Sequence, residues 1–147
     1  DVPIEDALTA LAEMQDRGYI EQIGVSNVSV EQLDRARDVV DVATVQNRYN
    51  LADREHEDVL AACEDAGIGF IPWYPLDAGA LEDPAVQAVA ERHDATPYQV
   101  ALAWLLDHSP VTLPIPGTGS VEHLEENVAA THLELDDEDH ERLDGVA

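Results

Sequence analysis

The spacing of hydrophobic and polar residues predicts alternating strands and helices. Four short apolar runs predict buried strands at residues 23–25, 43–46, 68–72 and 111–115. The first helix is expected to begin at Val2-Pro3 and stop at Gly18, and the second to be capped by Ser29 and to carry apolar positions up to Val40. Further helices are expected at residues 55–66, 84–93, 97–108 and 121–130, with a short amphipathic helix in LELDDEDHERLDGV.

Strands that are apolar along their length, each followed by a helix, indicate a parallel sheet covered by helices. The chain has 147 residues, the length of one ordinary domain, and no linker or low-complexity segment divides it. We therefore expect a single α/β domain over residues 1–147. The pattern alone fits either a doubly wound sheet or a barrel.

The charge of the chain narrows the classes of partner. It has 32 acidic residues and seven basic ones, all arginine, so its formal net charge is −25. Binding of nucleic acid or an anionic membrane through a basic surface is therefore not expected. The acidic residues decorate every predicted helix, and the composition resembles that of cytosolic proteins from salt-accumulating halophiles. Salt at about 1 M shortens the Debye length to about 3 Å and would screen the repulsion.

The remaining composition suggests a cytoplasmic protein without a metal. Cys63 is the single cysteine, which excludes an internal disulfide and suggests a reducing compartment. Neither a membrane-spanning apolar run nor a secretory signal is visible. The six histidines do not have the spacing of a metal site.

Polar residues cluster directly after all four predicted strands. The clusters are Ser26-Asn27 and residues 46–50, 73–76 and 116–120. Enzymes with parallel sheets bind their ligands at this end of the strands. The last cluster lies in IPGTGSVEHLEEN, where free backbone N–H groups at a helix start can hold an anion. Together the clusters offer carboxamides, hydroxyls, a flat aromatic ring and an anion-binding loop. A ligand that carries a phosphate and a flat ring with a carboxamide would use all of these groups.

Five stretches in series carry a resemblance to a known family. IGVSN, VQNRYNL, GIGFIPWYPL, TPYQVALAWLL and LPIPGTGSVEHLEENV resemble the aldo/keto reductase family, in that family's order and approximate spacing. The resemblance covers nearly the whole chain. It implies the C-terminal half of a (β/α)8 TIM barrel, with strands five to eight, because a full barrel needs about 250 residues. It also implies NAD(P)H-dependent interconversion of carbonyls and alcohols by hydride transfer.

The resemblance also implies a cofactor site. Ser26, Asn27 and Gln46 match residues that hydrogen-bond the nicotinamide carboxamide, and Trp73 matches an aromatic residue stacked on the nicotinamide ring. Tyr74 and Leu76 fall in the loop that passes the cofactor phosphates. The residues matched to the adenosine end are Pro116, Gly117, Thr118, Gly119 and Ser120 in the phosphate loop, and Glu126 and Asn127 at the adenine.

Two positions depart from the common family pattern. Gly117 stands where many members have lysine, and His123 stands where many have arginine for the 2′-phosphate. The expected cofactor is NADP, with NAD as the alternative. The family's catalytic Asp, Tyr, Lys and His lie on the first four strands, so no catalytic residue is expected here, and the chain contains no lysine.

Three interpretations of function follow. The first is the cofactor-binding half of an oxidoreductase that acts on small carbonyl substrates. The second is a non-catalytic nucleotide-binding half-barrel that acts as a sensor or partner subunit, and the third is a fragment without a role of its own. A half-barrel exposes apolar edges, so self-association or pairing with an N-terminal half is expected.

The proposed site residues also have simpler interpretations. Ser26-Asn27 could only cap the following helix. Trp73 could pack under a loop, and Gly117 and Gly119 could serve only a turn.

Overall fold

The computed structural model describes residues 2–146, and as far as β3 its helices and strands alternate as the sequence predicts. The first three units contain α1 (Ile4–Asp16), β1 (Ile23–Ser26), α2 (Val30–Arg37), β2 (Val42–Arg48), α3 (Glu57–Ala66) and β3 (Gly69–Trp73). The remaining elements are helical: α4 (Ala78–Leu81), α5 (Pro84–Arg92), α6 (Pro97–His108), α7 (Val121–Ala129), η1 (Ala130–His132), α8 (Asp137–Leu143) and η2 (Asp144–Val146).

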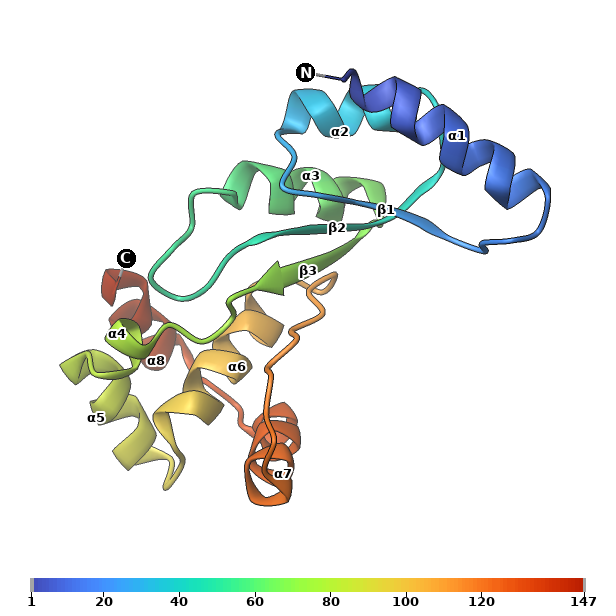
Figure 1. The fold of residues 1–147 in the computed structure, drawn as a ribbon. Coiled ribbons are helices and arrows are strands. Elements are labelled where there is room, and N and C mark those ends of the chain that lie inside the picture. The colour runs from blue at the N-terminus through green and yellow to red at the C-terminus, as the bar shows by residue number, and fades with distance from the viewer. Residues whose placement is uncertain (1, 147) are drawn as a thin grey trace.

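The three strands form a parallel sheet in the order β1-β2-β3 (Figure 1). Ser26 pairs with Gln46, and Arg48 pairs with Trp73. Buried and half-buried residues alternate from Val45 to Arg48 in β2 and along β3, because successive side chains of a strand point to opposite faces. Gln46, Arg48 and Trp73 therefore share the face of the sheet opposite to the core.

The core lies between the other face of the sheet and the helices. Figure 1 shows α1, α2 and α3 following one side of the strands, with α6 and α5 continuing the layer below β3. The largest fully buried side chains include Trp104, Tyr49 and Phe70. The Tyr49 ring meets Phe70 edge-on and stacks on Trp104, with centroids 5.7 and 6.2 Å apart, respectively. Trp104 is therefore a core residue of α6, as its helical spacing indicates.

The predicted fourth strand is wrong as a full strand. Only Thr112 forms a bridge, parallel to Phe70, with the Phe70 N–H donating to Val111 O at 2.8 Å and the Leu113 N–H donating to Phe70 O at 2.7 Å. Pro114 and Pro116 follow at once and have no N–H to continue a ladder. The segment occupies the place of a fourth strand beside β3, but its pairing with β3 is limited to the two hydrogen bonds of this bridge.

The helix cap predicted at Ser29 is confirmed, and the structure adds further caps. The Ser29 side chain accepts a hydrogen bond from the Gln32 N–H and completes a capping box, so Ser26 and Asn27 are not the cap of α2. Thr96 and Asp136 form capping boxes for α6 and α8. The helix α2 ends at Arg37, before the expected Val40. The short helix α4, which is not among the predicted helices, begins at the Asp77 cap.

Cys63 behaves as a packed apolar side chain. It is fully buried in α3, and burial raises the pKa of its thiol to about 11, so it stays protonated at neutral pH. Across residues 2–146, the helices are all too short or too polar to cross a membrane.

A buried carboxylate fastens α8 to the end of α5. Asp139 is fully buried, and its oxygens lie 2.5 Å from Arg92 Nη1 and 2.7 Å from His93 Nε2. Arg92 also pairs with Asp136, the cap of α8. Burial alone would raise the pKa of Asp139, but the hydrogen bonds from His93, from the Asp136 backbone and from Arg92 outweigh it and hold that pKa below its usual value.

We predict that Asp139→Asn lowers the free energy of unfolding by about 2 kcal/mol at pH 7, because charge-assisted hydrogen bonds are lost. Because the folded pKa of Asp139 is depressed, its contribution is complete above the unfolded pKa of about 4 and is lost as the pH falls further. The difference between wild type and variant should therefore shrink below about pH 4. Urea unfolding of both proteins in 1 M KCl, at pH 7 and below pH 4, measures this difference in the free energy of unfolding.

Glu138→Gln is the matched control, because Glu138 is exposed on the same helix and its ion pair is with Arg142 four residues away. It should change stability by less than about 0.5 kcal/mol. Equal losses in the two variants would contradict the fastening by Asp139.

Candidate functional site

One group of predicted site residues meets at the carboxyl ends of the strands. The Asn27 N–H and the Ser26 Oγ donate to Gln46 O, at 3.0 and 2.9 Å, respectively. Asn27 Nδ2 donates to Ser26 Oγ at 3.1 Å, and Trp73 Nε1 donates to Asn27 Oδ1 at 2.8 Å. Residues from three strands thus form one connected polar edge, and Trp73 is tied to it through its indole nitrogen. The Gln46 carboxamide makes no hydrogen bond to the described residues.

Two asparagines of the polar cluster at residues 46–50, which were not among the predicted cofactor residues, hold this edge in place. Asn47 is fully buried, with Oδ1 accepting from the Val28 N–H at 3.1 Å and Nδ2 donating to Val28 O at 2.8 Å. Asn50 Nδ2 donates to Tyr74 O at 3.0 Å. These bonds anchor the segments after β1 and β3, where Asn27 and Tyr74 adopt positive φ angles of 54° and 58°. Backbone strain of this kind persists where neighbouring contacts enforce it.

A second group of predicted residues lines one cavity. The cavity has a volume of about 190 Å³ and lies where α7 and the loop before it approach α6 and the segment after β3. Its lining comprises Leu76, Tyr98, Gly117, Thr118, His123, Glu126 and Asn127. Six of these are predicted cofactor residues from two segments about 40 residues apart in sequence. Tyr98 also lines the cavity but was not predicted as a cofactor residue. It is half-exposed at the start of α6, and its position in that helix gives no sign of ligand binding.

The remaining predicted residues lie near these two groups. Ser120 caps α7, where its Oγ accepts from the His123 N–H at 3.4 Å, and its own N–H donates to Thr118 Oγ1 at 3.1 Å. Gly117 and Gly119 are exposed, and a Cβ at either position would meet open space. Pro116 lines a neighbouring apolar hollow rather than this cavity.

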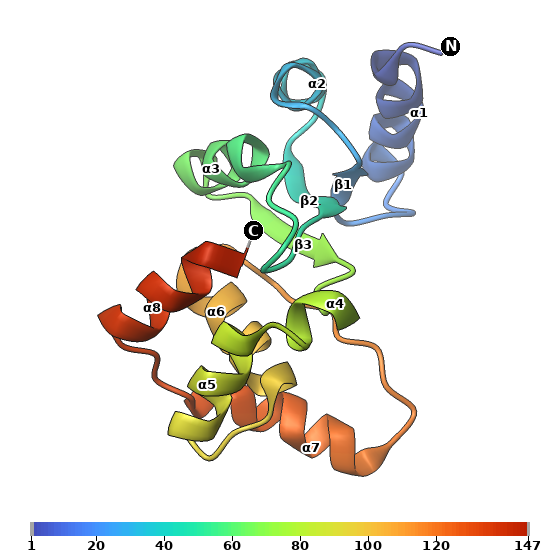
Figure 2. The same cartoon turned by 90° about the vertical axis from the view of Figure 1, so that its left-hand side faces the viewer.

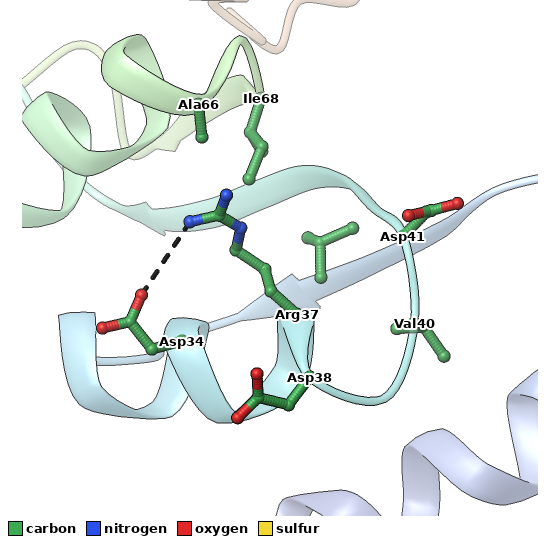
Figure 3. Close-up of a pocket in the computed structure, with 8 residues that line it drawn as sticks. Asp34, Arg37, Asp38, Val40, Asp41, Ala66 and Ile68 are labelled. Atoms are coloured by element: carbon green, nitrogen blue, oxygen red, sulfur yellow. Dashed lines mark ion pairs between the residues drawn. The ribbon is translucent and has the colours of Figure 1, made fainter.

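The larger hollow of the structure lies at the other end of the sheet (Figure 3). Its volume is about 550 Å³, and its lining includes Val42, the first residue of β2, and Ile68, just before β3. Arg37 reaches across it and pairs with Asp34 at 3.9 Å (Figure 3). Enzymes with parallel strands place their sites at the opposite, carboxyl end, so this hollow is not the candidate site. Within residues 2–146, acidic, histidine and cysteine side chains form no group that could hold a metal ion.

Parallel strands with helices on one face and polar side chains at their carboxyl ends define part of an α/β barrel. The aldo/keto reductase family model matches residues 1–147. An uncharacterized oxidoreductase of Schizosaccharomyces pombe is 46% identical over 145 residues, covering 97% of this chain and 47% of the relative. Pyridoxine 4-dehydrogenase of Escherichia coli is also 46% identical over 145 residues, covering 98% of this chain and 51% of that enzyme.

Solved structures agree with the sequence relatives. A thermostable aldo-keto reductase crystallised with the inhibitor epalrestat superposes with a TM-score of 0.88 at 34% identity, covering 99% of this chain and 56% of that one. The aldo/keto reductase of Klebsiella pneumoniae in complex with NADP and acetate gives 0.89 at 29% identity, covering 99% and 55%. The chain belongs to the aldo/keto reductase family, and its fold is the C-terminal half of the family's (β/α)8 barrel. It spans about half the length of the curated relatives it matches.

We predict that Asn47→Ala lowers the free energy of unfolding by about 2 kcal/mol, because two buried hydrogen bonds to Val28 are lost. It should also change the Trp73 fluorescence, since the segment that carries Asn27 is released. Urea unfolding followed by tryptophan emission measures both effects.

Asn127→Ala is the control, because it removes the same side chain from a half-exposed site. It should leave both quantities nearly unchanged. If Asn47→Ala changed stability and fluorescence no more than Asn127→Ala does, the polar edge would not depend on Asn47.

Proposed function

We propose that this chain forms the cofactor-binding half of an NAD(P)H-dependent oxidoreductase that interconverts aldehydes or ketones with alcohols by hydride transfer. The observation that carries the proposal is the cavity of about 190 Å³ shared by Leu76, Gly117, Thr118, His123, Glu126 and Asn127. It provides an apolar side chain for a purine, carboxylate and amide groups for hydrogen bonds, and a helix start for a phosphate.

The nicotinamide end of the cofactor would occupy the polar edge. Ser26, Asn27 and Gln46 offer hydroxyl and amide groups that complement a carboxamide. The indole of Trp73 offers a flat surface and is fixed by its hydrogen bond to Asn27 Oδ1 at 2.8 Å. Tyr74 and Leu76 follow directly and would lie beneath the phosphates. The solved complexes of two relatives, with NADP and with NADPH, support a nicotinamide cofactor.

We propose NADP(H) as the preferred cofactor, with His123 beside the 2′-phosphate. His123 lines the cavity in the first turn of α7, where the helix dipole also favours an anion. The dipole contributes only about 0.3–1 kcal/mol at an exposed site, so a side-chain donor has to add to it.

The proton needed to complete carbonyl reduction would come from outside these residues. The family's Asp, Tyr, Lys and His lie on its first four strands, and this chain has no lysine to tune a tyrosine. We therefore propose that the 147 residues alone bind the cofactor without turning over a carbonyl substrate. The alternative function is a sensor or partner subunit without catalysis. For either function we propose the cytoplasm of a halophile as the setting, because high salt screens the repulsion within a chain of net charge −25.

We predict that Glu126→Ala weakens binding of NADPH and of adenosine 2′,5′-bisphosphate by about tenfold, through loss of a hydrogen-bonding group in the cavity. Glu125→Ala removes the same charge from the same helix outside the cavity and should leave both affinities unchanged. Quenching of tryptophan fluorescence in 1 M KCl measures each affinity, and the same titration with NADH ranks the two cofactors.

Equal affinities in the two variants would exclude the cavity as the adenine site. Absence of any binding to the folded wild-type chain would exclude cofactor binding by this half alone.

We further propose that an apolar hollow marks where a neighbouring part of the barrel would pack. It has a volume of about 400 Å³ between α6, α7 and the segment that carries Ile115. Leu124 and Val128 on α7 line it and are each more than half exposed. Figure 2 shows α7 at the end of the molecule opposite to α1.

We predict that the isolated chain sediments above its monomer mass of 16.0 kDa in 1 M KCl, because exposed apolar surface drives association. The double variant Leu124→Asn, Val128→Asn should shift the mass toward the monomer. Val121→Asn, on an exposed residue of the same helix outside the hollow, should not. A monomeric wild type would contradict the proposed packing surface.

A further inference from the structure

Arg48 places a positive charge at the polar edge beside the proposed nicotinamide surface. It is the last residue of β2 and pairs in register with Trp73. Its guanidinium carbon lies 5.8 Å from the Trp73 ring centroid and 5.2 Å from that of Tyr74. Two aromatic rings thus hold the guanidinium at the carboxyl end of the strands, on the same face as Gln46.

The hydrogen-bonding capacity of Arg48 is not used by the described residues. Its Nε is buried and lies 2.9 Å from Asp53 Oδ2, yet it donates no aligned hydrogen bond. The two terminal amino groups also make no hydrogen bond within residues 2–146. An arginine fork that stays 44% exposed between fixed aromatic rings is an available donor set.

A purely structural function for Arg48 explains these observations poorly. A partly exposed ion pair with Asp53 contributes about 0–1 kcal/mol, and this one lacks a well-aligned hydrogen bond. Arg35, which is exposed to a similar extent, by contrast makes two hydrogen bonds to Glu5 at 2.7 and 2.8 Å. Arg48 is therefore held in place mainly by its aromatic neighbours, and its N–H groups remain available to donate hydrogen bonds to a ligand.

We propose that Arg48 is a specificity-determining residue that binds the oxyanion of a ligand group lying beside Trp73, either the phosphate next to the nicotinamide or a carboxylate of the carbonyl substrate. The planar guanidinium binds either anion through two parallel hydrogen bonds. Asp53 is its resting counter-ion, which the ligand anion replaces. The proposal rests on the cofactor site described under the proposed function and adds the chemistry of the group bound there.

The test compares ligands that differ only by the anion, in 1 M KCl. Reduced nicotinamide mononucleotide carries one phosphate and reduced nicotinamide riboside carries none. Succinic semialdehyde and butyraldehyde form the corresponding carboxylate pair, titrated into the chain saturated with NADPH. Arg48→Gln removes the charge, Arg48→Lys keeps the charge without the fork, and Arg37→Gln makes the same charge change at the opposite end of the sheet.

We expect Arg48→Gln to weaken the anionic member of one pair by about tenfold and to leave its uncharged partner unchanged. Arg48→Lys should recover only part of the loss, Asp53→Asn should strengthen anion binding, and Arg37→Gln should have no effect. A loss confined to the mononucleotide assigns the phosphate, and one confined to the semialdehyde assigns the substrate carboxylate.

The proposal is overturned if the wild-type chain does not prefer either anion over its uncharged partner, or if Arg48→Gln weakens neither. Adenosine 2′,5′-bisphosphate separates this outcome from failure of the proposed function, because it reports on the cavity near α7 and not on Arg48. Binding of that compound together with an unaffected Arg48→Gln variant would overturn this inference alone.

Discussion

The two-residue period of β2 is the constraint on which the rest of the structure depends. Val45 and Asn47 are buried, while Gln46 and Arg48 take the opposite face. A slip of one residue would bury a guanidinium against the helices and turn core side chains toward the open face. Pairing with a strand on each side fixes the register, and Asn47 adds two hydrogen bonds to the segment after β1. The core and the polar edge are therefore aligned by the same strand.

The parts of the fold that local chemistry determines could be predicted from the sequence. The central strand begins with a largely apolar stretch, Val42 to Val45, and ends in polar residues. The Ser29 cap lies three residues before Gln32, its capping-box partner. The segment after Val111 is apolar too, but its prolines limit it to one bridge with Phe70. The two groups of proposed cofactor residues could be assigned only through the family resemblance, because hydroxyl and amide residues after a strand can equally serve as helix caps.

Contacts between distant residues could not be predicted in this way. Asn47 reads as one more polar residue at a strand end, and its importance depends on Val28, 19 residues earlier. Asp139 lies in an acidic run that resembles a solvated surface, and only the approach of His93, 46 residues away, shows why it is buried. Tyr98 likewise becomes part of a cavity only when α7 folds back toward α6. Each of these is a pairing created by the tertiary fold, which no local pattern encodes.

The charge distribution explains how so acidic a chain could hold an anion. All seven arginines lie within 3.9 Å of a carboxylate, so the positive charge of the protein is largely neutralised locally. The cavity near α7 has His123 as the basic residue of its lining, and its other donors are uncharged hydroxyl, amide and backbone N–H groups. At about 1 M salt, repulsion from the acidic surface is screened beyond about 3 Å, whereas hydrogen bonds at contact distance remain. A binding site that relies on donors at contact distance is therefore compatible with such an acidic surface. Arg48 also acts at contact distance, because its guanidinium lies beside two aromatic rings and its donors are not used within residues 2–146.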